Sequence, residues 1–489
     1  MKKKILNLLL TTLSVSSLAA CGGSSASAKE ITFWHCIGHT KMRNLNRIID
    51  KFNADHAKTD GYYIHPEKLN GDYDSLHDAV KTKLQAGYVP SITMGYPDSF
   101  SEYIGNSGEA GSKILKLDSF IDGDAAFNKD DFVTEYYKEG TGYQYAGTWS
   151  VPLYKSTEAM YINKQMFERT AFYNAHKDDT YGNYGAKISD PSTWDWNTLM
   201  YIATEVQKEK GKQADFHAVG YDSDSNLFIS QMAMRKIPYT SAEGKGAEHF
   251  LFVDPTTGKI NEDFKAMCAE IFDLTQFGAL ATKGSYGSYS SDLFLSKKSM
   301  IAIGSTGGSA YNDPKSSTQS DFNCELYAVP AFGGKANAKY IMQGPSLCFF
   351  NTGDEKKQAA AWEFYSKYVS DPTLNAELSL ENSYDPVRKS SYETESYNTW
   401  VALGKTNTGE DDINAQLQYR IPSLTASLKD NYYATPVFNG SGEARTQIGE
   451  IIKYAQAEDK KLTTLEKVTN AIEKAYDQCM LYMRGVNEK

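Results

Sequence analysis

Segments with the two-residue period of a strand alternate along this chain with segments that have the 3.6-residue period of a helix. Residues 31–34 (ITFW) predict a short buried strand, and residues 42–52 place five apolar side chains on one helical face. Residues 76–84 predict a second helix that Gly87 ends, and residues 91–94 predict the next strand. This alternation predicts an α/β architecture with mainly parallel sheet.

The same periods continue to the end of the chain. Further helices are predicted around residues 199–206, 264–274, 362–369 and 465–480, and further strands at residues 299–303 and 340–342. No internal repeat with a fixed period interrupts the pattern.

Composition excludes several classes of protein. The 489 residues are 41% hydrophobic and 23% charged, which is typical of globular domains and predicts two to four of them. A formal net charge of −10 with no basic block argues against nucleic-acid binding, because phosphates are neutralised by clustered Lys and Arg. Six cysteines in a chain of this length do not make a disulfide framework.

The N-terminus carries an export signal. Residues 1–4 (MKKK) are positively charged, and residues 5–20 are apolar or small and too few to span a bilayer. Residues 18–22 (LAACG) resemble a bacterial lipobox, a resemblance that implies removal of residues 1–20 and acylation of Cys21. Residues 21–29 then predict the lipidated cysteine and a flexible tether. We therefore expect a protein anchored by lipid on the outer face of a cell membrane.

Catalytic and metal-binding signatures are absent from the sequence. No nucleophile elbow, phosphate loop or zinc helix is found, and residues 222–226 (DSDSN) lack the glycine and the closing glutamate of a calcium loop. His35 and His39 flank Cys36 without a second pair of ligands. We expect no cofactor, no metal and no enzymatic activity.

Features suited to binding are abundant. The chain has 34 Tyr, whose rings stack on sugars and whose hydroxyls form hydrogen bonds. Residues 304–309 (GSTGGS) follow a predicted strand and expose backbone N–H groups and hydroxyls to a hydroxyl-rich or anionic ligand.

Several blocks, taken in order, resemble the extracellular solute-binding proteins of ABC importers, in the group that binds sugars and glycerol 3-phosphate. The blocks lie at residues 31–35 (ITFWH), 86–92 (AGYVPSI), 151–164 (VPLYKSTEAMYINK), 191–194 (PSTW) and 384–387 (YDPV). The resemblance implies a two-lobed α/β periplasmic-binding-protein fold, with hinge strands and a ligand cleft between the lobes. The ligand would be a small molecule captured by closure of the lobes and delivered by a monomer to the membrane permease.

The resemblance also implies that both lobes are discontinuous. We expect residues 30–150 and 304–350 in lobe 1, and residues 151–303 and 351–489 in lobe 2. The chain would cross between the lobes near residues 149–154, 299–305 and 349–352.

Within the group, the nearest resemblance is to glycerol-3-phosphate-binding proteins. It implies ligand contacts by residues that match their motifs one by one: His35, Tyr73, Ser156, Ser305, Gly344, Tyr384 and Arg445. The chain departs from the pattern at Asp98, which would have to replace a glutamate from a position one residue late, and at Asp222, which lies where those proteins have a tryptophan. Both acids are included in the expected site, and an oligosaccharide or another polyol stays as open as glycerol 3-phosphate.

The leading interpretation is a lipid-anchored binding protein of an ABC importer. The alternatives are a secreted carbohydrate-active lipoprotein enzyme and a surface adhesin or sensor lipoprotein. Residues 173–187, rich in Tyr, Asn and Gly, either gate the cleft or lie apart from it.

Overall fold

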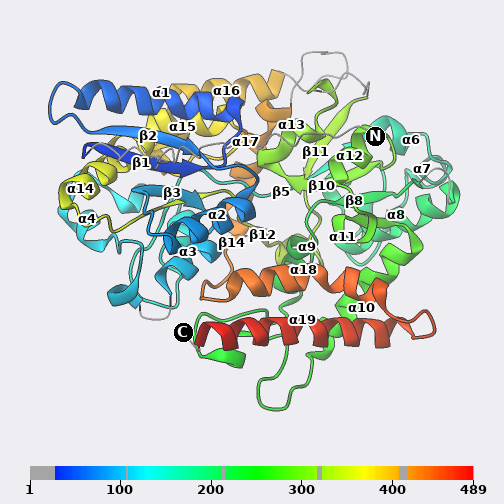
Figure 1. Ribbon diagram of the computed structural model, residues 1–489. Coiled ribbons are helices and arrows are strands. Elements are labelled where there is room, and N and C mark those ends of the chain that lie inside the picture. Colours follow the sequence, from blue (N-terminus) through cyan, green and yellow to red (C-terminus); the bar gives the residue numbers. More distant parts are fainter. Residues whose placement is uncertain (1–27, 106–107, 212–214, 317–321, 407–416, 488–489) are drawn as a thin grey trace, which may run out of the picture.

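The structure is a computed structural model that describes residues 28–105, 108–211, 215–316, 322–406 and 417–487. The expected signal peptide, Cys21 and most of the tether lie outside the described residues. Figure 1 shows two α/β lobes side by side, with the two C-terminal helices running along one edge. Each lobe is built around a five-stranded sheet.

The first sheet has the strand order β2-β1-β3-β13-β4. Its strands are β1 (Glu30–His35), β2 (Tyr63–Lys68), β3 (Ile92–Gly95), β4 (Val151–Pro152) and β13 (Ser346–Phe349). The second sheet has the order β11-β5-β10-β8-β9. Its strands are β5 (Glu158–Asn163), β8 (Val219–Tyr221), β9 (Leu280–Thr282), β10 (Ile301–Ser305) and β11 (Cys324–Ala328).

Strand direction differs from the expectation of a mainly parallel sheet. The pairs β1–β2, β1–β3, β8–β9 and β8–β10 are parallel, as strand–helix–strand units require. However, β13 is antiparallel to β3 and β4, and β5 is antiparallel to β10 and β11. Both sheets are mixed because β5 and β13 each follow a segment that arrives from the other lobe and enter their sheets against the direction of the neighbouring strands.

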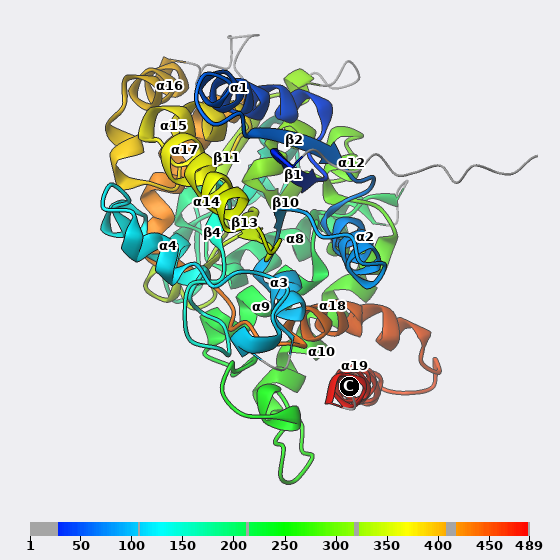
Figure 2. The same cartoon turned by 60° about the vertical axis from the view of Figure 1, so that its left-hand side comes forward.

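Helices cover the first sheet on both faces (Figure 1 and Figure 2). They are α1 (His39–His56), α2 (Tyr73–Gln85), α3 (Pro97–Ile104), α4 (Asp118–Gly123), α5 (Thr134–Glu139), α14 (Glu355–Glu363) and α15 (Pro372–Glu381). The apolar stripe predicted at residues 42–52 is buried along α1, and Gly87 follows α2 at φ +85°, a backbone conformation that favours glycine. One hydrophobic core joins these elements, and we call this part the first lobe.

A separate core joins the second sheet to its helices, and we call this part the second lobe. Its helices are α6 (Lys164–Glu168), α7 (Ala171–His176), α8 (Trp196–Lys210), α9 (Asp224–Arg235), α10 (Glu262–Phe277), α11 (Lys283–Tyr286), α12 (Ser290–Leu295), α18 (Ser441–Ala457) and α19 (Thr464–Asn487). A hairpin of β6 (Thr180–Tyr181) and β7 (Ala186–Lys187) lies between α7 and α8, within the segment 173–187. Short α13 (Ser309–Asn312), with α16 (Glu395–Thr406) and α17 (Leu417–Leu428), packs beside β10, β11 and α15.

The division of the chain between the cores differs from the expected boundaries. Residues of α14, of the π-helix Phe364–Val369 and of α15 pack in the first core, although 351–489 was assigned to the second lobe. Strand β11 lies in the second sheet, although 304–350 was assigned to the first lobe. Periodicity reports which face of an element is buried, and it carries no information on which of two similar cores buries it.

Within the described residues, three segments carry the chain between the two sheets or their cores. Residues 153–157 join β4 to β5, residues 329–345 join β11 to β13, and residues 434–440 join β14 (Tyr432–Tyr433) to α18. The first passage lies close to its predicted place, whereas the passages predicted at 299–305 and 349–352 are wrong, because β10 and β13 each stay within one sheet. The passages are tied together by β12 (Tyr340–Ile341) pairing with β14 and by bridges from Lys155 to Asp385 and from Ser156 to Gln343.

A buried cation holds this crossing region together. The ammonium of Lys155 is fully buried, forms an ion pair with Glu139, and donates to the Gly344 carbonyl and the Ser346 hydroxyl at 3.0 Å each. Burial lowers the pKa of Lys155, and Glu139 opposes that shift. The network therefore fixes the backbone around Gly344 against the first passage.

No helix among the described residues is both long enough and apolar enough to cross a membrane.

Candidate ligand-binding site

A row of tyrosines lies where the two lobes meet. Tyr73 is the first residue of α2, Tyr96 precedes α3, and their ring centroids are 4.9 Å apart in an edge-to-face arrangement. The Tyr73 hydroxyl is near enough to Tyr384 to lower its pKa, and Tyr384 packs on Tyr154, with ring centroids 4.2 Å apart. Burial raises the pKa of Tyr384 to about 12, so that these hydroxyls stay neutral donors and acceptors at physiological pH.

Arg445 of α18 lies at one end of the row. Its positive charge opposes the rise in the pKa of Tyr96 that burial causes. Its guanidinium donates a hydrogen bond to the side-chain oxygen of Asn226 on α9. The Asn226 amide donates in turn to Glu158 on β5 at 2.9 Å, and Glu158 also accepts from the Tyr221 hydroxyl. Arg445 is therefore positioned by a chain of hydrogen bonds within the second lobe.

Asp98 connects this end of the site to the first lobe. It lies in the first turn of α3 and accepts a hydrogen bond of 2.5 Å from the Ser441 hydroxyl at the start of α18. Burial raises the pKa of Asp98, and the nearby Arg445 opposes the shift. The pair Asp98–Ser441 is thus a direct contact between the lobes.

Ser156, Ser305 and Gly344 line the crossing region beside the row. The hydroxyls of Ser156 and Ser305 are 3.4 Å apart, and Ser305 also caps the turn Thr306–Gly308 by accepting from the Gly307 N–H at 3.2 Å. Gly344 has φ +95°, and a Cβ there would lie 2.6 Å from the Tyr154 carbonyl oxygen. The close approach of the two backbones at Gly344 requires glycine.

Two further expected site residues are engaged in local hydrogen bonds of their own. His35 is buried at the end of β1, where its Nδ1 accepts from the Ile37 N–H at 3.1 Å, and burial lowers its pKa to about 4. Asp222 accepts from the N–H and hydroxyl of Ser290 at 2.8 and 2.7 Å, and its carboxylate lies against Gly304. His35 thus shapes the first loop as a neutral ring, and Asp222 is engaged inside the second lobe.

The residues that the structure brings together form one set, which we call the interlobe cluster. Its members are Tyr73, Tyr96, Asp98, Ser156, Ser305, Gly344, Tyr384 and Arg445, with Asn226 and Glu158 behind Arg445. Tyr96, Asn226 and Glu158 were not expected. Tyr96 directly precedes the Pro97-Asp98 pair, so its position next to the expected site was a usable signal.

A further unexpected residue is Lys41 in the first turn of α1. Its ammonium donates to the Gly307 carbonyl at 2.8 Å and lies 4.6 Å from the centroid of the Tyr384 ring. No sequence motif marks Lys41. The contacts of its ammonium are with residues at least 266 positions further along the chain, and only the fold brings them close to it.

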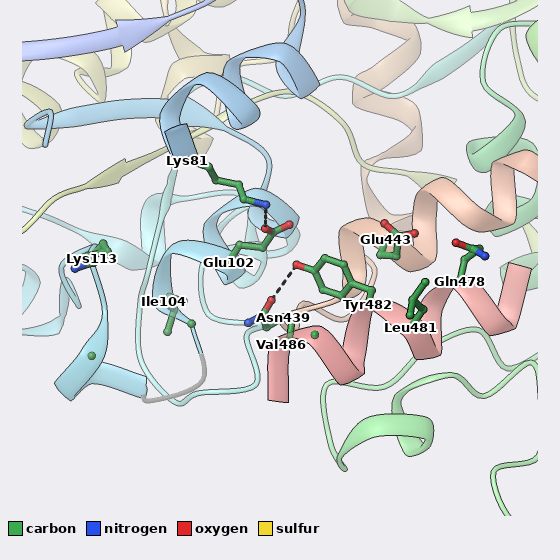
Figure 3. A pocket seen from close by; sticks show the side chains of 13 residues that line it. Lys81, Glu102, Ile104, Lys113, Asn439, Glu443, Gln478, Leu481, Tyr482 and Val486 are labelled. Atoms are coloured by element: carbon green, nitrogen blue, oxygen red, sulfur yellow. Dashed lines mark hydrogen bonds and ion pairs between the residues drawn. The ribbon is translucent and has the colours of Figure 1, made fainter. Parts of the chain in front are cut away.

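A separate cavity of about 910 Å³ lies between α3 and the C-terminal helices (Figure 3). Its wall includes the ion pair of Lys81 with Glu102 and the Tyr482 hydroxyl, which donates to the Asn439 side chain at 3.3 Å. None of the expected site residues lines this cavity, so it is distinct from the interlobe cluster.

Comparison with known proteins agrees with this architecture. The curated relatives include two sn-glycerol-3-phosphate-binding periplasmic proteins UgpB. The protein of Yersinia enterocolitica is 26% identical over 161 residues, which cover 32% of this chain and 34% of the relative. The protein of Pectobacterium atrosepticum is 25% identical over 196 residues, or 37% and 41% of the two chains. The matches thus span well under half of either relative.

Solved structures match over nearly the whole chain. UgpB from Mycobacterium tuberculosis in complex with glycerophosphocholine has a TM-score of 0.62 at 16% identity, covering 92% of this chain and 98% of that one. Maltose-bound MalE3 of T. maritima has a TM-score of 0.62 at 13% identity, covering 91% and 98%. At these identities the likeness is one of fold, and it confirms the predicted two-lobed architecture.

A comparison with family models adds evidence from the sequence to this evidence from the fold. The model, described as bacterial extracellular solute-binding protein, matches residues 47–405, which is well over half of the chain and includes parts of both lobes. The protein therefore belongs to the bacterial extracellular solute-binding family.

Proposed function

We propose that this protein is the lipid-anchored binding subunit of an ABC importer. It captures a hydroxyl-rich solute, either a saccharide, another polyol or glycerol 3-phosphate, by closure of its two lobes on the outer face of the membrane. The loaded form then docks on the permease, to which the lipid on Cys21 keeps it close.

The observation that supports the proposal best is the composition of the interlobe cluster. The first lobe contributes the neutral rings and hydroxyls of Tyr73, Tyr96 and Tyr384, which suit sugar C–H faces and polyol hydroxyls. The second lobe contributes Arg445, which can pair with a phosphoryl group in a bidentate manner. Because the two sets belong to different lobes, a ligand between them is gripped only when the lobes are together.

A thermal-shift panel tests the proposal on the chain that begins after Cys21. The probes are glycerol 3-phosphate, glycerophosphocholine, maltose, maltotriose and glycerol, each present at about a hundredfold over its dissociation constant. A ligand that binds only the folded state then adds about 2.7 kcal/mol to its stability. A shift with any probe supports a binding protein, and the set of active probes separates phosphate from neutral-sugar recognition. A protein that no probe stabilises, and that turns over a glycan instead, contradicts it.

The lipid anchor is tested independently of the ligand. We expect the full chain expressed in a bacterium to incorporate labelled palmitate and to sediment with membranes, because the lipobox cysteine accepts the acyl chains. Cys21→Ser is expected to lose the label and to appear in the soluble fraction. Equal labelling of both proteins would show that residues 1–20 act as an ordinary secretory signal.

A further inference from the structure

Lys41 makes a hydrogen bond from one lobe to the other. It lies on α1, whose apolar face packs in the first core, and its ammonium donates at 2.8 Å to the carbonyl of Gly307. Gly307 follows β10, a strand of the second sheet, in the short turn Thr306–Gly308. The bond therefore exists only while the two lobes are together.

Tyr384 completes this contact. Its ring packs on the first core, and the Lys41 ammonium lies 4.6 Å from the ring centroid, within the range of a cation–π interaction. A Cβ on Gly307 would lie 2.6 Å from two atoms of the same ring. The turn can thus pack against the ring only because residue 307 has no side chain.

The position of Lys41 is unfavourable for a merely structural lysine. The first turn of a helix is the positive end of its dipole, where a cation is disfavoured. Among the described residues no carboxylate lies within ion-pair distance of its ammonium, and burial lowers its pKa to about 8. What it contacts instead is the Gly307 carbonyl and the Tyr384 face, so its placement stabilises the meeting of the lobes.

The contact has a counterpart across the site. Asp98 and Ser441 join the lobes beside Arg445, while Lys41 and Gly307 join them beside Tyr384. The tyrosine row runs from one contact to the other through Tyr73 and Tyr96.

We propose that Lys41, Gly307 and Tyr384 form a latch that holds the lobes closed over the ligand and so determines how slowly the ligand leaves. The affinity part of this inference rests on the proposed function, whereas the closure part depends only on the contact itself.

Two neighbouring glycines provide a matched test. Gly307→Ala adds a methyl group that collides with the Tyr384 ring only when the lobes are together. Gly308→Ala adds the same group one residue later, where the nearest atom, on Tyr311, is 3.7 Å away in ordinary contact. Lys41→Met removes the ammonium without adding bulk beside Gly307. Melting temperatures identify any variant that fails to fold.

Affinity and shape are measured on the wild type and the three variants, using the probe from the panel that binds the wild type. We expect Gly307→Ala to bind about tenfold more weakly through faster dissociation, and to keep a larger radius of gyration in small-angle scattering. Lys41→Met should change both quantities in the same direction, and Gly308→Ala should match the wild type in radius of gyration. Equal affinity and equal scattering of Gly307→Ala and Gly308→Ala would overturn the latch. If no probe binds the wild type and the protein turns over a glycan instead, the proposed function fails, and scattering of the ligand-free proteins alone decides the latch.

Discussion

The two halves of the interlobe cluster differ in how their side chains are held. In the first lobe Tyr73, Tyr96 and Tyr384 are positioned by ring packing, and their hydroxyls stay neutral. In the second lobe Arg445 is positioned by a hydrogen-bonded chain through Asn226 to Glu158.

The first half of the cluster therefore determines the shape of the site, and the second half determines its charge. A ring that is wedged among other rings keeps its place when one hydroxyl is removed, because dispersion contacts and burial hold it. A charge that is held through an amide and a buried acid depends on every member of its chain, because an unsatisfied buried polar group is costly. We expect changes in the second half to spread further than changes in the first.

The largest expected effect concerns the buried acid at the base of the second half. Burial raises the pKa of Glu158 to about 7, so the folded protein binds this proton more tightly than the unfolded chain. Stability from this group is complete below about pH 4.5 and is lost as the pH rises through 7, on the order of 3 kcal/mol in total. We expect Glu158→Gln, which stays neutral, to flatten this loss in urea unfolding at pH 5 and pH 7.5.

The first lobe offers a matched acid for that measurement. Burial also raises the pKa of Asp385 to about 7, and its carboxylate accepts from Thr425 at 2.5 Å. Asp385→Asn should therefore flatten the pH dependence of the free energy of unfolding over the same range. It should do so without altering the hydrogen bonds that hold Arg445. If the free energy of unfolding depends on pH equally in the wild type and in Glu158→Gln, the pKa of Glu158 is not raised. The hydrogen-bonded chain from Arg445 through Asn226 to a buried Glu158 would then be wrong.

The next effect concerns Arg445 itself. We expect Arg445→Ala to weaken glycerol 3-phosphate binding roughly thirtyfold or more, about 2 kcal/mol, because a desolvated charge pair with the phosphoryl group is lost. Isothermal titration with glycerol 3-phosphate and with maltotriose measures it. An equal loss of affinity for both probes would mean that Arg445 supports the structure of the site and does not recognise the phosphoryl charge. An unchanged affinity for glycerol 3-phosphate would mean that Arg445 does not belong to the ligand site.

The smallest effect is expected in the first half. Tyr384→Phe keeps the ring and removes only the hydroxyl that interacts with Tyr73, a change of about 0.5–1.5 kcal/mol. Affinity for the active probe should fall by roughly threefold to tenfold, with compaction in small-angle scattering unchanged because the ring still packs on Gly307. A loss as large as that of Arg445→Ala would erase the difference between the two halves.

The sequence by itself determined the elements and the kind of fold. The apolar stripes of α1, α8, α10 and α19 and the buried strands β1 and β3 follow from local period, since burial of one face is a property of neighbouring residues. The resemblance of ordered blocks brought Tyr73, Ser305, Tyr384 and Arg445 into one expected site, and that assignment stays a prediction for the binding experiments.

Tertiary structure alone decided where each segment belongs and which polar groups meet. The strands β10 and β13 read alike in sequence, yet each sheet takes only one of them, because similar apolar faces fit either core until the whole chain is packed. Lys41 and Gly307 are separated by 266 residues, and Asn226 links Glu158 to Arg445 by hydrogen bonds. Contacts between distant residues are set by how two lobes close on each other, which no local pattern encodes.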